Sequence, residues 1–214
     1  MFTCKRFESS KYSGEYLDYL FYEADNSEPL PLLIHLPGAG SRGTDIQILE
    51  DSSFVKKIQE MGGVPARVIM PQCRFETWFD YFHVLCEFIE TNINDPAIDQ
   101  NRVYIMGDSM GGYAAWQLCI SHPEWFAAAV PICGGGMYWD AGRLKHIAVW
   151  AFHGAKDPVV LCCESEHMVE WINQAGGNAK LTIFPEADHN AWDPTHSCQE
   201  MWDWLFQQKK GNHL

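Results

Sequence analysis

The residues around Ser109 form the clearest chemical pattern in the sequence. Residues 107–111 read GDSMG, which matches G-x-S-x-G. An apolar run, residues 102–106, precedes this motif, and an alanine-containing segment of helical character follows it. A strand, a sharp turn and a helix in this order form a nucleophile elbow, in which the serine hydroxyl stands above the sheet edge. The pattern therefore indicates a nucleophilic serine, against the alternative of a glycine-rich turn with an incidental serine.

A nucleophilic serine needs two partners, which the order of the chain helps to find. A histidine must accept the hydroxyl proton, and a carboxylate must orient that histidine. In the elbow architecture the acid and then the histidine follow later strands. Asp157 follows the apolar run 147–152, and His189 lies in the loop after the run 179–184. We therefore predict Ser109, Asp157 and His189 as a catalytic triad.

The other candidates for these two roles fit less well. The competing histidines lie within or at the ends of expected elements, with His196 placed at the start of a helix: His122, His153, His167 and His196. Asp188 and Asp193 flank His189 too closely in the chain to orient its ring. A metal site built from Asp188, His189, Asp193 and His196 matches no helical or zinc-knuckle spacing. No metal and no organic cofactor is expected.

The reaction also needs two backbone amides to hold the negative charge that develops on the carbonyl oxygen. One is expected at Met110, directly after the nucleophile. The other is expected in the glycine-rich loop 37–45 (PGAGSRGTD), at Ala39 first and Gly40 next. The loop lacks both glycine patterns that cradle phosphate groups. We therefore predict an oxyanion hole formed by Ala39 and Met110.

The hydrophobic pattern predicts the scaffold that would bring these loops together. Short unbroken apolar runs are typical of strands covered on both faces, and they occur at residues 32–36, 66–70, 102–106, 127–132, 147–152 and 179–184. Segments with helical patterns lie at residues 44–61, 80–91, 110–121, 163–174 and 197–208. This alternation predicts an α/β fold with a mostly parallel central sheet and helices on both faces. One or two antiparallel edge strands are expected in the first 22 residues, and residues 1–214 are expected to form a single domain.

Composition narrows the range of partners. The 214 residues include 15 Lys and Arg against 28 Asp and Glu, a formal net charge of −13. This charge argues against nucleic acid and anionic membranes as partners. No apolar run approaches the ~20 residues of a membrane helix, and the first residues lack the layout of a secretory signal. We expect a cytoplasmic protein whose eight cysteines are reduced and mostly serve as small apolar side chains.

With these residues in place, the chain resembles the α/β-hydrolase superfamily. More narrowly, it resembles the compact serine esterases of the feruloyl/acetyl esterase and "predicted peptidase" type, related to the phospholipase/carboxylesterase group. The resemblance runs from about Leu32 onward and rests on ordered blocks, which are PGAGSRGTD, MPQC, DQNRVYIMGDSMGGYAAW, HPEWFAAAVPICGGG, HGAKDPVV and DHNAWDPT. It implies the α/β-hydrolase fold and the same nucleophile, acid, base and oxyanion donors: Ser109, Asp157, His189, Ala39 and Met110.

Two features of the chain differ from larger or more typical relatives. The family usually has His-Gly before the oxyanion loop, whereas this chain has Pro37-Gly38. Proline removes a backbone amide, and the bracing hydrogen bond of the histidine is lost with it. The interval 133–146, where lipases and larger hydrolases commonly insert a cap, is short and rich in glycine. No large cap domain is expected, and an open site favours short-acyl or exposed esters.

The candidate substrate-binding residues lie near expected strand ends, and they are Gly40, Trp78, Met137 and Trp192. A tryptophan beside the catalytic histidine suits stacking on a sugar or an aryl acid, and equally suits packing of its own loop. The sequence therefore predicts a serine carboxylesterase for small-molecule esters with short-acyl or aryl groups, feruloyl or acetyl saccharides included. Its activity should fall when acid protonates His189. The alternatives are a serine peptidase or thioesterase with the same triad, and a noncatalytic ligand-binding protein of this fold.

Overall fold

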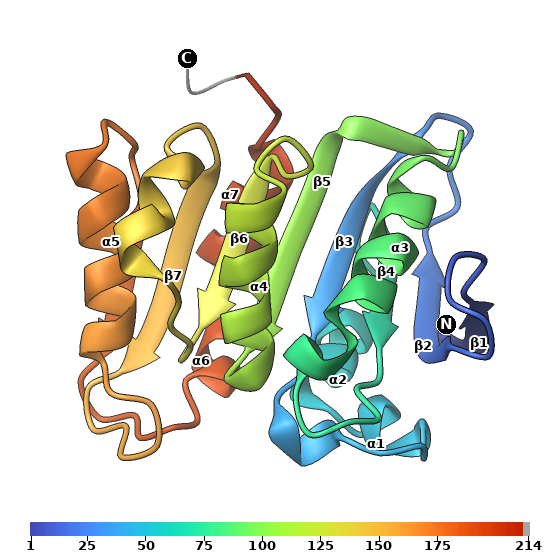
Figure 1. Ribbon diagram of the computed structural model, residues 1–214, viewed down its shortest axis with the longest axis horizontal. Coiled ribbons are helices and arrows are strands. Elements are labelled where there is room, and N and C mark those ends of the chain that lie inside the picture. The colour runs from blue at the N-terminus through green and yellow to red at the C-terminus, as the bar shows by residue number, and fades with distance from the viewer. Residues whose placement is uncertain (212–214) are drawn as a thin grey trace.

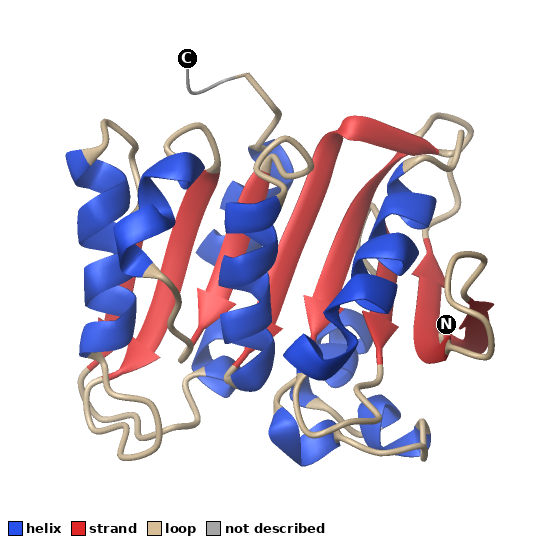
Figure 2. Cartoon of the chain, viewed as in Figure 1, coloured by secondary structure: helices blue, strands red, loops and turns tan. Residues whose placement is uncertain are grey.

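The computed structural model describes residues 1–211 and contains an eight-stranded sheet covered by helices (Figure 1). The strand order is β1-β2-β4-β3-β5-β6-β7-β8. Pairing is parallel from β4 through β3 to β8, and antiparallel between β1 and β2 and between β2 and β4. The mostly parallel sheet, the helices on both faces (Figure 2) and the antiparallel strands at the N-terminal edge confirm the predicted fold class.

The elements follow the order that the hydrophobic pattern predicts. The strands are β1 (Thr3–Glu8), β2 (Tyr16–Glu23), β3 (Leu30–Leu36), β4 (Arg67–Pro71), β5 (Ile98–Asp108), β6 (Ala128–Ile132), β7 (Ala148–Gly154) and β8 (Lys180–Phe184). The α-helices are α1 (Gln47–Glu50), α2 (Ser53–Glu60), α3 (Phe82–Ile93), α4 (Met110–Ser121), α5 (Cys163–Gln174), α6 (Trp192–His196) and α7 (Gln199–Gln207). The 3-10 helices are η1 (Ala39–Ser41), η2 (Trp78–Tyr81) and η3 (Tyr138–Leu144).

The central strands owe their position to unbroken apolar sequence. Strands β3, β4, β6 and β7 are buried at every residue, because a parallel sheet with helices on both faces leaves neither face to solvent. Helices α3, α4 and α5 contribute to the core on one face, and α2 and α7 contribute to the core on the other. The carboxyl ends of the parallel strands meet at one edge of the sheet, the lower edge in Figure 1.

Two details differ from the sequence-based expectation. The helical pattern over residues 44–61 is interrupted, because the Ser52 side chain accepts a hydrogen bond from the backbone amide of Val55 at 3.3 Å and starts α2 as a new helix. Ser52 is therefore an N-cap residue rather than a position inside one helix. His196 ends the short helix α6 instead of beginning the next helix.

Two observations bear on the expectations from composition. Within residues 1–211, no helix combines the length and the apolar character needed to cross a membrane. All eight cysteines lie in the described part of the chain and are free thiols, and Cys73, Cys119 and Cys133 are buried.

Candidate active site

The turn between β5 and α4 holds Ser109 in a strained conformation. Its backbone has φ 52° and ψ −113°, in the positive-φ region that side-chain-bearing residues rarely adopt. The Ser109 amide donates a hydrogen bond to the carbonyl of Ile132 at 2.8 Å, and its carbonyl accepts one from the amide of Tyr113 at 3.0 Å. These bonds from β6 and α4 fix the turn, which has the geometry of a nucleophile elbow.

The glycines of the motif are required by close packing of backbone against backbone. A Cβ at Gly107 would overlap the carbonyl oxygen of Gly111, and a Cβ at Gly111 would overlap the carbonyl oxygen of Leu36. No side chain fits at either position without moving β3, β5 or α4. The G-x-S-x-G spacing is therefore a packing requirement of this turn, and the serine is its outward-facing residue.

The three residues predicted as a triad lie in one hydrogen-bonded line. The Ser109 hydroxyl oxygen lies 2.8 Å from His189 Nε2, and His189 Nδ1 lies 2.7 Å from Asp157 Oδ2. The three side chains come from the loops after β5, β7 and β8. A serine proton can pass to the imidazole in this arrangement, and a carboxylate stands ready to stabilise the imidazolium that forms.

The surroundings of Asp157 fix its charge and orient His189. Its Oδ1 accepts hydrogen bonds from the amides of Val159 and Val160 at 2.8 and 2.9 Å. Burial acts to raise the pKa of Asp157, but hydrogen bonds from His189 and from these two amides prevail and hold that pKa below its ordinary value. The ionised carboxylate accepts a hydrogen bond from the Nδ1–H group of His189. The other ring nitrogen, Nε2, is then unprotonated, and its lone pair faces Ser109.

His153 is the second histidine beside Asp157, and it has a structural role. Its Nε2 lies 3.3 Å from Asp157 Oδ2, but the hydrogen bonds that orient its ring are made to other residues. Its Nδ1 lies 2.7 Å from the hydroxyl of Ser165, and its Nε2 donates to the carbonyl of Val160 at 2.9 Å. This agrees with the interpretation of His153 as a structural residue at a strand end.

The loop expected to supply an oxyanion donor lies against the nucleophile. A Cβ built on Gly38 would lie 3.4 Å from the Cβ of Ser109. Ala39 begins η1 and Met110 begins α4, so the amide of each precedes the first hydrogen bond of its helix and has no acceptor within it. Neither amide is used by its own helix, as the prediction of both as oxyanion donors requires.

Pro37 does not leave this loop without support. The indole nitrogen of Trp78 donates to the carbonyl of Pro37 at 3.1 Å, the Arg42 guanidinium donates to the carbonyl of Ala39 at 3.0 Å, and the Gln72 amide donates to the carbonyl of Ser41 at 3.1 Å. The prediction of Trp78 as a substrate-binding residue is wrong, because its side chain is fully buried and braces the loop from beneath.

A cavity of about 400 Å³ opens beside Ser109 and His189. Gly40 and Trp192 line it, and the Trp192 ring stands perpendicular to the His189 ring at 5.4 Å between centroids. Met137 is not among the residues that line this cavity, and it is partly buried against the core on the face that α3, α4 and α5 cover. Proximity to a strand end does not distinguish a pocket wall from a packing residue.

Several lining residues were not anticipated from the sequence. They are Ser41, Ser52, Ser53, Met70, Asp108 and Val159. Val159 is an apolar side chain with 68% of its surface exposed, two positions after the predicted acid. The sequence signal for Val159 and Asp108 is their closeness in the chain to Asp157 and Ser109, whereas Ser53 and Met70 reach the site through the placement of α2 and β4.

A second buried carboxylate, Asp108, lies next to Ser109 in the chain. Burial acts to raise its pKa, but the nearby rings of His35 and His196 prevail and hold the pKa of Asp108 far below its ordinary value. Burial lowers the pKa of the His35 imidazole, against the opposing effect of Asp108. Ser109 is therefore preceded in the chain by an ionised carboxylate, Asp108, in addition to its link through His189 to Asp157.

The parallel sheet, the strained serine turn and the loops at the carboxyl ends of the strands define an α/β-hydrolase fold of the esterase and peptidase type. Within the chain, residues 80–140 match the prolyl oligopeptidase family. These residues contain α3, β5 with the Ser109 turn, α4 and β6. No curated protein sequence matches the chain.

Three solved structures show the range of similar proteins. A thermostable esterase is 30% identical with a TM-score of 0.86, over 98% of this chain and 63% of its own. A ferulic acid esterase is 13% identical with a TM-score of 0.74, over 96% of this chain and 99% of its own. An acylaminoacyl peptidase from Pyrococcus horikoshii is 14% identical with a TM-score of 0.72, over 99% of this chain and 42% of its own. The chain thus spans about two thirds or less of the esterase and the peptidase.

Proposed function

We propose that this protein is a serine carboxylesterase that hydrolyses short-acyl or aryl esters through an acyl-enzyme. The observation that carries the proposal is the continuous hydrogen-bonded line from Ser109 through His189 to Asp157 at the wall of an open cavity. A hydrogen-bonded line of this kind serves nucleophilic catalysis because each group activates the next. The two esterases among the similar structures support the reaction class.

The mechanism follows from the geometry of the line. The Ser109 hydroxyl attacks the ester carbonyl carbon while its proton moves to His189 Nε2. The amides of Ala39 and Met110 donate to the carbonyl oxygen as it becomes negative. His189 then protonates the leaving alcohol, which departs and leaves an acyl group on Ser109. Water attacks this acyl-enzyme by the same steps, releasing the acid and restoring the serine.

The shape of the site favours small or exposed esters. Residues 133–146, where a cap would be inserted, contain the 3-10 helix η3 as their one helix, so this interval supplies no cap domain. The walls of the cavity include Val159 and Trp192, whose apolar side chains suit a short acyl chain or an aromatic acid. The ferulic acid esterase among the similar structures supports the aryl class. The eight free cysteines support a reducing, cytoplasmic location.

A serine peptidase is the second candidate, and two findings favour it. Residues 80–140 match the prolyl oligopeptidase family, and an acylaminoacyl peptidase shares the fold. The same triad would attack an amide, but the amine must be protonated more fully before it leaves. The cavity of about 400 Å³ beside Ser109 suits a small ester better than a peptide that extends on both sides of the bond. An ester substrate therefore fits the site better.

The deciding experiment compares p-nitrophenyl acetate, an aryl amide and an acyl-CoA thioester on the wild-type protein and on Ser109→Ala. We expect ester turnover well above amide and thioester turnover, and a loss of at least about 10⁴-fold in Ser109→Ala. Ser121→Ala is the matched control, because this hydroxyl lies at the far end of α4 and bonds only Gln117. Unchanged ester turnover in Ser109→Ala would overturn the catalytic assignment.

Two further measurements separate the remaining alternatives. A fluorophosphonate should label Ser109 stoichiometrically, whereas a noncatalytic binding protein of this fold would not react. In a panel of acetyl, butyryl, octanoyl and feruloyl esters, we expect the acetyl and feruloyl esters to be preferred. A strong preference for the octanoyl ester would contradict the short-acyl or aryl cavity while leaving the triad assignment intact.

A further inference from the structure

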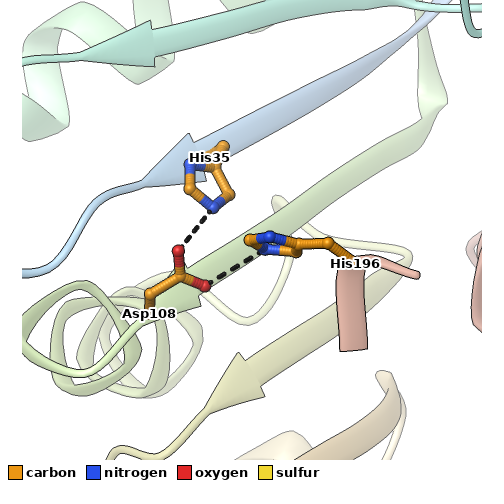
Figure 3. Close-up of side chains that lie close together, drawn as sticks. All are labelled: His35, Asp108 and His196. Carbon is orange, nitrogen blue, oxygen red and sulfur yellow. Dashed lines mark ion pairs between the residues drawn. The ribbon is translucent and has the colours of Figure 1, made fainter. Parts of the chain in front are cut away.

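Three buried polar side chains converge behind the nucleophile. His35 lies near the end of β3, Asp108 is the last residue of β5, and His196 is the last residue of α6. Their exposed fractions are 1%, 9% and 1%. Figure 3 shows both imidazole rings directed at the carboxylate from different elements. The proposed ester mechanism uses none of the three.

The contacts within this group are close, but they are not hydrogen bonds. His35 Nε2 lies 3.1 Å from Asp108 Oδ2, and His196 Nε2 lies 3.4 Å from Asp108 Oδ1. Within residues 1–211, both Nε2 atoms, Asp108 Oδ1 and His35 Nδ1 are buried with no hydrogen-bond partner. Buried polar atoms almost always have a partner. Both Nε2 atoms and Asp108 Oδ1 belong to side chains whose ligand atoms lie within 4.8 Å of one another, which indicates a missing partner among them.

The geometry points to a site for a divalent transition-metal ion, held by His35, Asp108 and His196. One ligand atom from each side chain lies within 4.8 Å of the others. Around a tetrahedral zinc ion with bonds of ~2.1 Å, neighbouring ligand atoms lie about 3.4 Å apart. His35 Nε2 lies 3.1 Å from Asp108 Oδ2 and His196 Nε2 lies 3.4 Å from Asp108 Oδ1, so each imidazole is at about this spacing from one of the two carboxylate oxygens. Two imidazoles and one carboxylate suit Zn²⁺ and its first-row neighbours rather than Ca²⁺ or Mg²⁺.

The surroundings orient the two rings for binding. His196 Nδ1 lies 3.1 Å from the hydroxyl of Ser53, which can accept the Nδ1 proton and so leave the Nε2 lone pair facing Asp108. The His35 ring stacks on Phe54, with 3.8 Å between centroids and 12° between planes. Neither ring needs to turn to bind an ion. Both supporting residues come from the first turn of α2.

The site has an entry path and is distinct from the proposed triad. Asp108 and Ser53 both line the cavity, so an ion and one water ligand can enter from there. Cys133, Asp157 and His189 also lie within ligand distance of one another. However, Asp157 and His189 are already hydrogen-bonded to each other and to Ser109, which leaves no unpartnered atom for an ion.

A bound ion would connect the three segments on which the proposed mechanism depends. His35 stands two residues before Pro37 and the oxyanion loop, Asp108 precedes Ser109, and His196 ends the helix that follows the His189 loop. A metal bridge between β3, β5 and α6 would therefore stabilise the site without taking part in bond cleavage. Its measurable effect is on stability.

Zinc chloride is the probe for the test. The wild-type protein is treated with a chelator, incubated with ZnCl₂, dialysed, and its metal content measured by elemental analysis. We expect one Zn²⁺ per chain and a rise of several degrees in the melting temperature, reversed by the chelator. His189→Ala should retain the ion. The double variant His35→Phe/Asp108→Leu should lose it, since it removes two ligands and leaves no orphaned charge.

The opposite results would overturn the inference. Absence of retained Zn²⁺ in the wild type would mean that the group is an internal ion pair. Retention by the double variant, or loss in His189→Ala, would place the ion at the triad or elsewhere. If the double variant does not fold, His196→Gln provides the comparison, because it keeps a polar side chain of similar reach. It should bind Zn²⁺ at least tenfold more weakly than the wild type, and equal binding would refute the site.

Discussion

Two buried aspartates accompany Ser109, one as its neighbour in the chain and one linked to it through His189, and each stands between two histidines. Around Asp157 every polar group has a directed partner. His189 and the amides of Val159 and Val160 donate to the carboxylate, and His153 is bonded to other groups. The hydrogen bonds of this group are all formed within the folded chain, and they fix which ring nitrogen of His189 carries the proton. Such order is what proton transfer to and from a nucleophile requires.

Around Asp108 the same residue types are arranged differently. His35 and His196 approach the carboxylate at 3.1 and 3.4 Å without forming hydrogen bonds. Each imidazole faces a different oxygen of this carboxylate, and both Nε2 atoms and Asp108 Oδ1 are left without a hydrogen-bond partner in the described part of the chain. The comparison shows that the same residue types, one aspartate and two histidines, do not by themselves determine what a buried group does. A completed His–Asp–His group suits proton transfer, whereas an incomplete one suits an additional ligand.

A third buried carboxylate shows what a purely structural role requires. Glu87 in α3 is 4% exposed and accepts hydrogen bonds from Ser9, Ser10 and Lys11 in the loop between β1 and β2. These bonds prevail over burial and lower the pKa of Glu87. The carboxylate is fully partnered and remote from the cavity, so it fastens the N-terminal strands to the body of the protein.

The largest expected effect separates the two aspartates directly. Asp157→Asn should lower kcat for an ester by about 10⁴-fold, because an amide does not hold His189 in the required tautomer. Asp108→Asn should have a much smaller effect, because Asp108 makes no contact with His189. Its loss in kcat should be at least a hundred times smaller than the loss in Asp157→Asn. Steady-state kinetics on p-nitrophenyl acetate measures both. Equal losses in the two variants would show that the groups do not have separate roles.

An intermediate effect tests the backbone contact on the Asp157 side. A Cβ at Gly154, at the end of β7, would overlap the carbonyl oxygen of Asp188, next to His189. Gly154→Ala should lower the free energy of unfolding by about 3 kcal/mol and reduce ester turnover by displacing His189. A Cβ at Gly40 would meet nothing within 4 Å, so Gly40→Ala should change stability by less than about 0.5 kcal/mol. Urea unfolding measures both variants.

The smallest expected effect concerns acid. Because the pKa of Asp157 is lowered in the folded state, the unfolded chain binds its proton more readily. The resulting stabilisation is present above the unfolded pKa of about 3.9 and is lost as pH falls through the folded value. The free energy of unfolding should therefore decrease below about pH 4. Asp157→Asn should show a shallower decrease in urea unfolding between pH 6 and pH 3, and an identical decrease would contradict the assigned cause.

The sequence was sufficient for the features that local pattern determines. Unbroken apolar runs predicted the central strands, because burial on both faces leaves no alternation in the sequence. The motif around Ser109 predicted the turn, because its glycines are needed by backbone contacts that any such elbow makes. Asp157 and His189 were found by their order after later strands, and the structure brings both to Ser109.

Features that depend on side-chain direction were not predictable. Trp78 and Met137 follow strands as Trp192 does, yet only Trp192 reaches the cavity. The grouping of His35, Asp108 and His196 needs three distant segments to be placed together. The polar His35 within the apolar run 30–36 was its one visible sign. His196 was considered with its sequence neighbours, whereas its spatial neighbours come from β3 and β5.

The strained turn at Ser109 also has a consequence for synthesis of the chain. Its backbone is held by the carbonyl of Ile132 on β6 and by the packing of Gly111 against Leu36 on β3. A newly made polypeptide cannot hold this conformation until those distant segments have docked, and His189 arrives later still. On the proposed mechanism, a nascent or partly folded chain is inert, and hydrolysis begins only with the completed molecule.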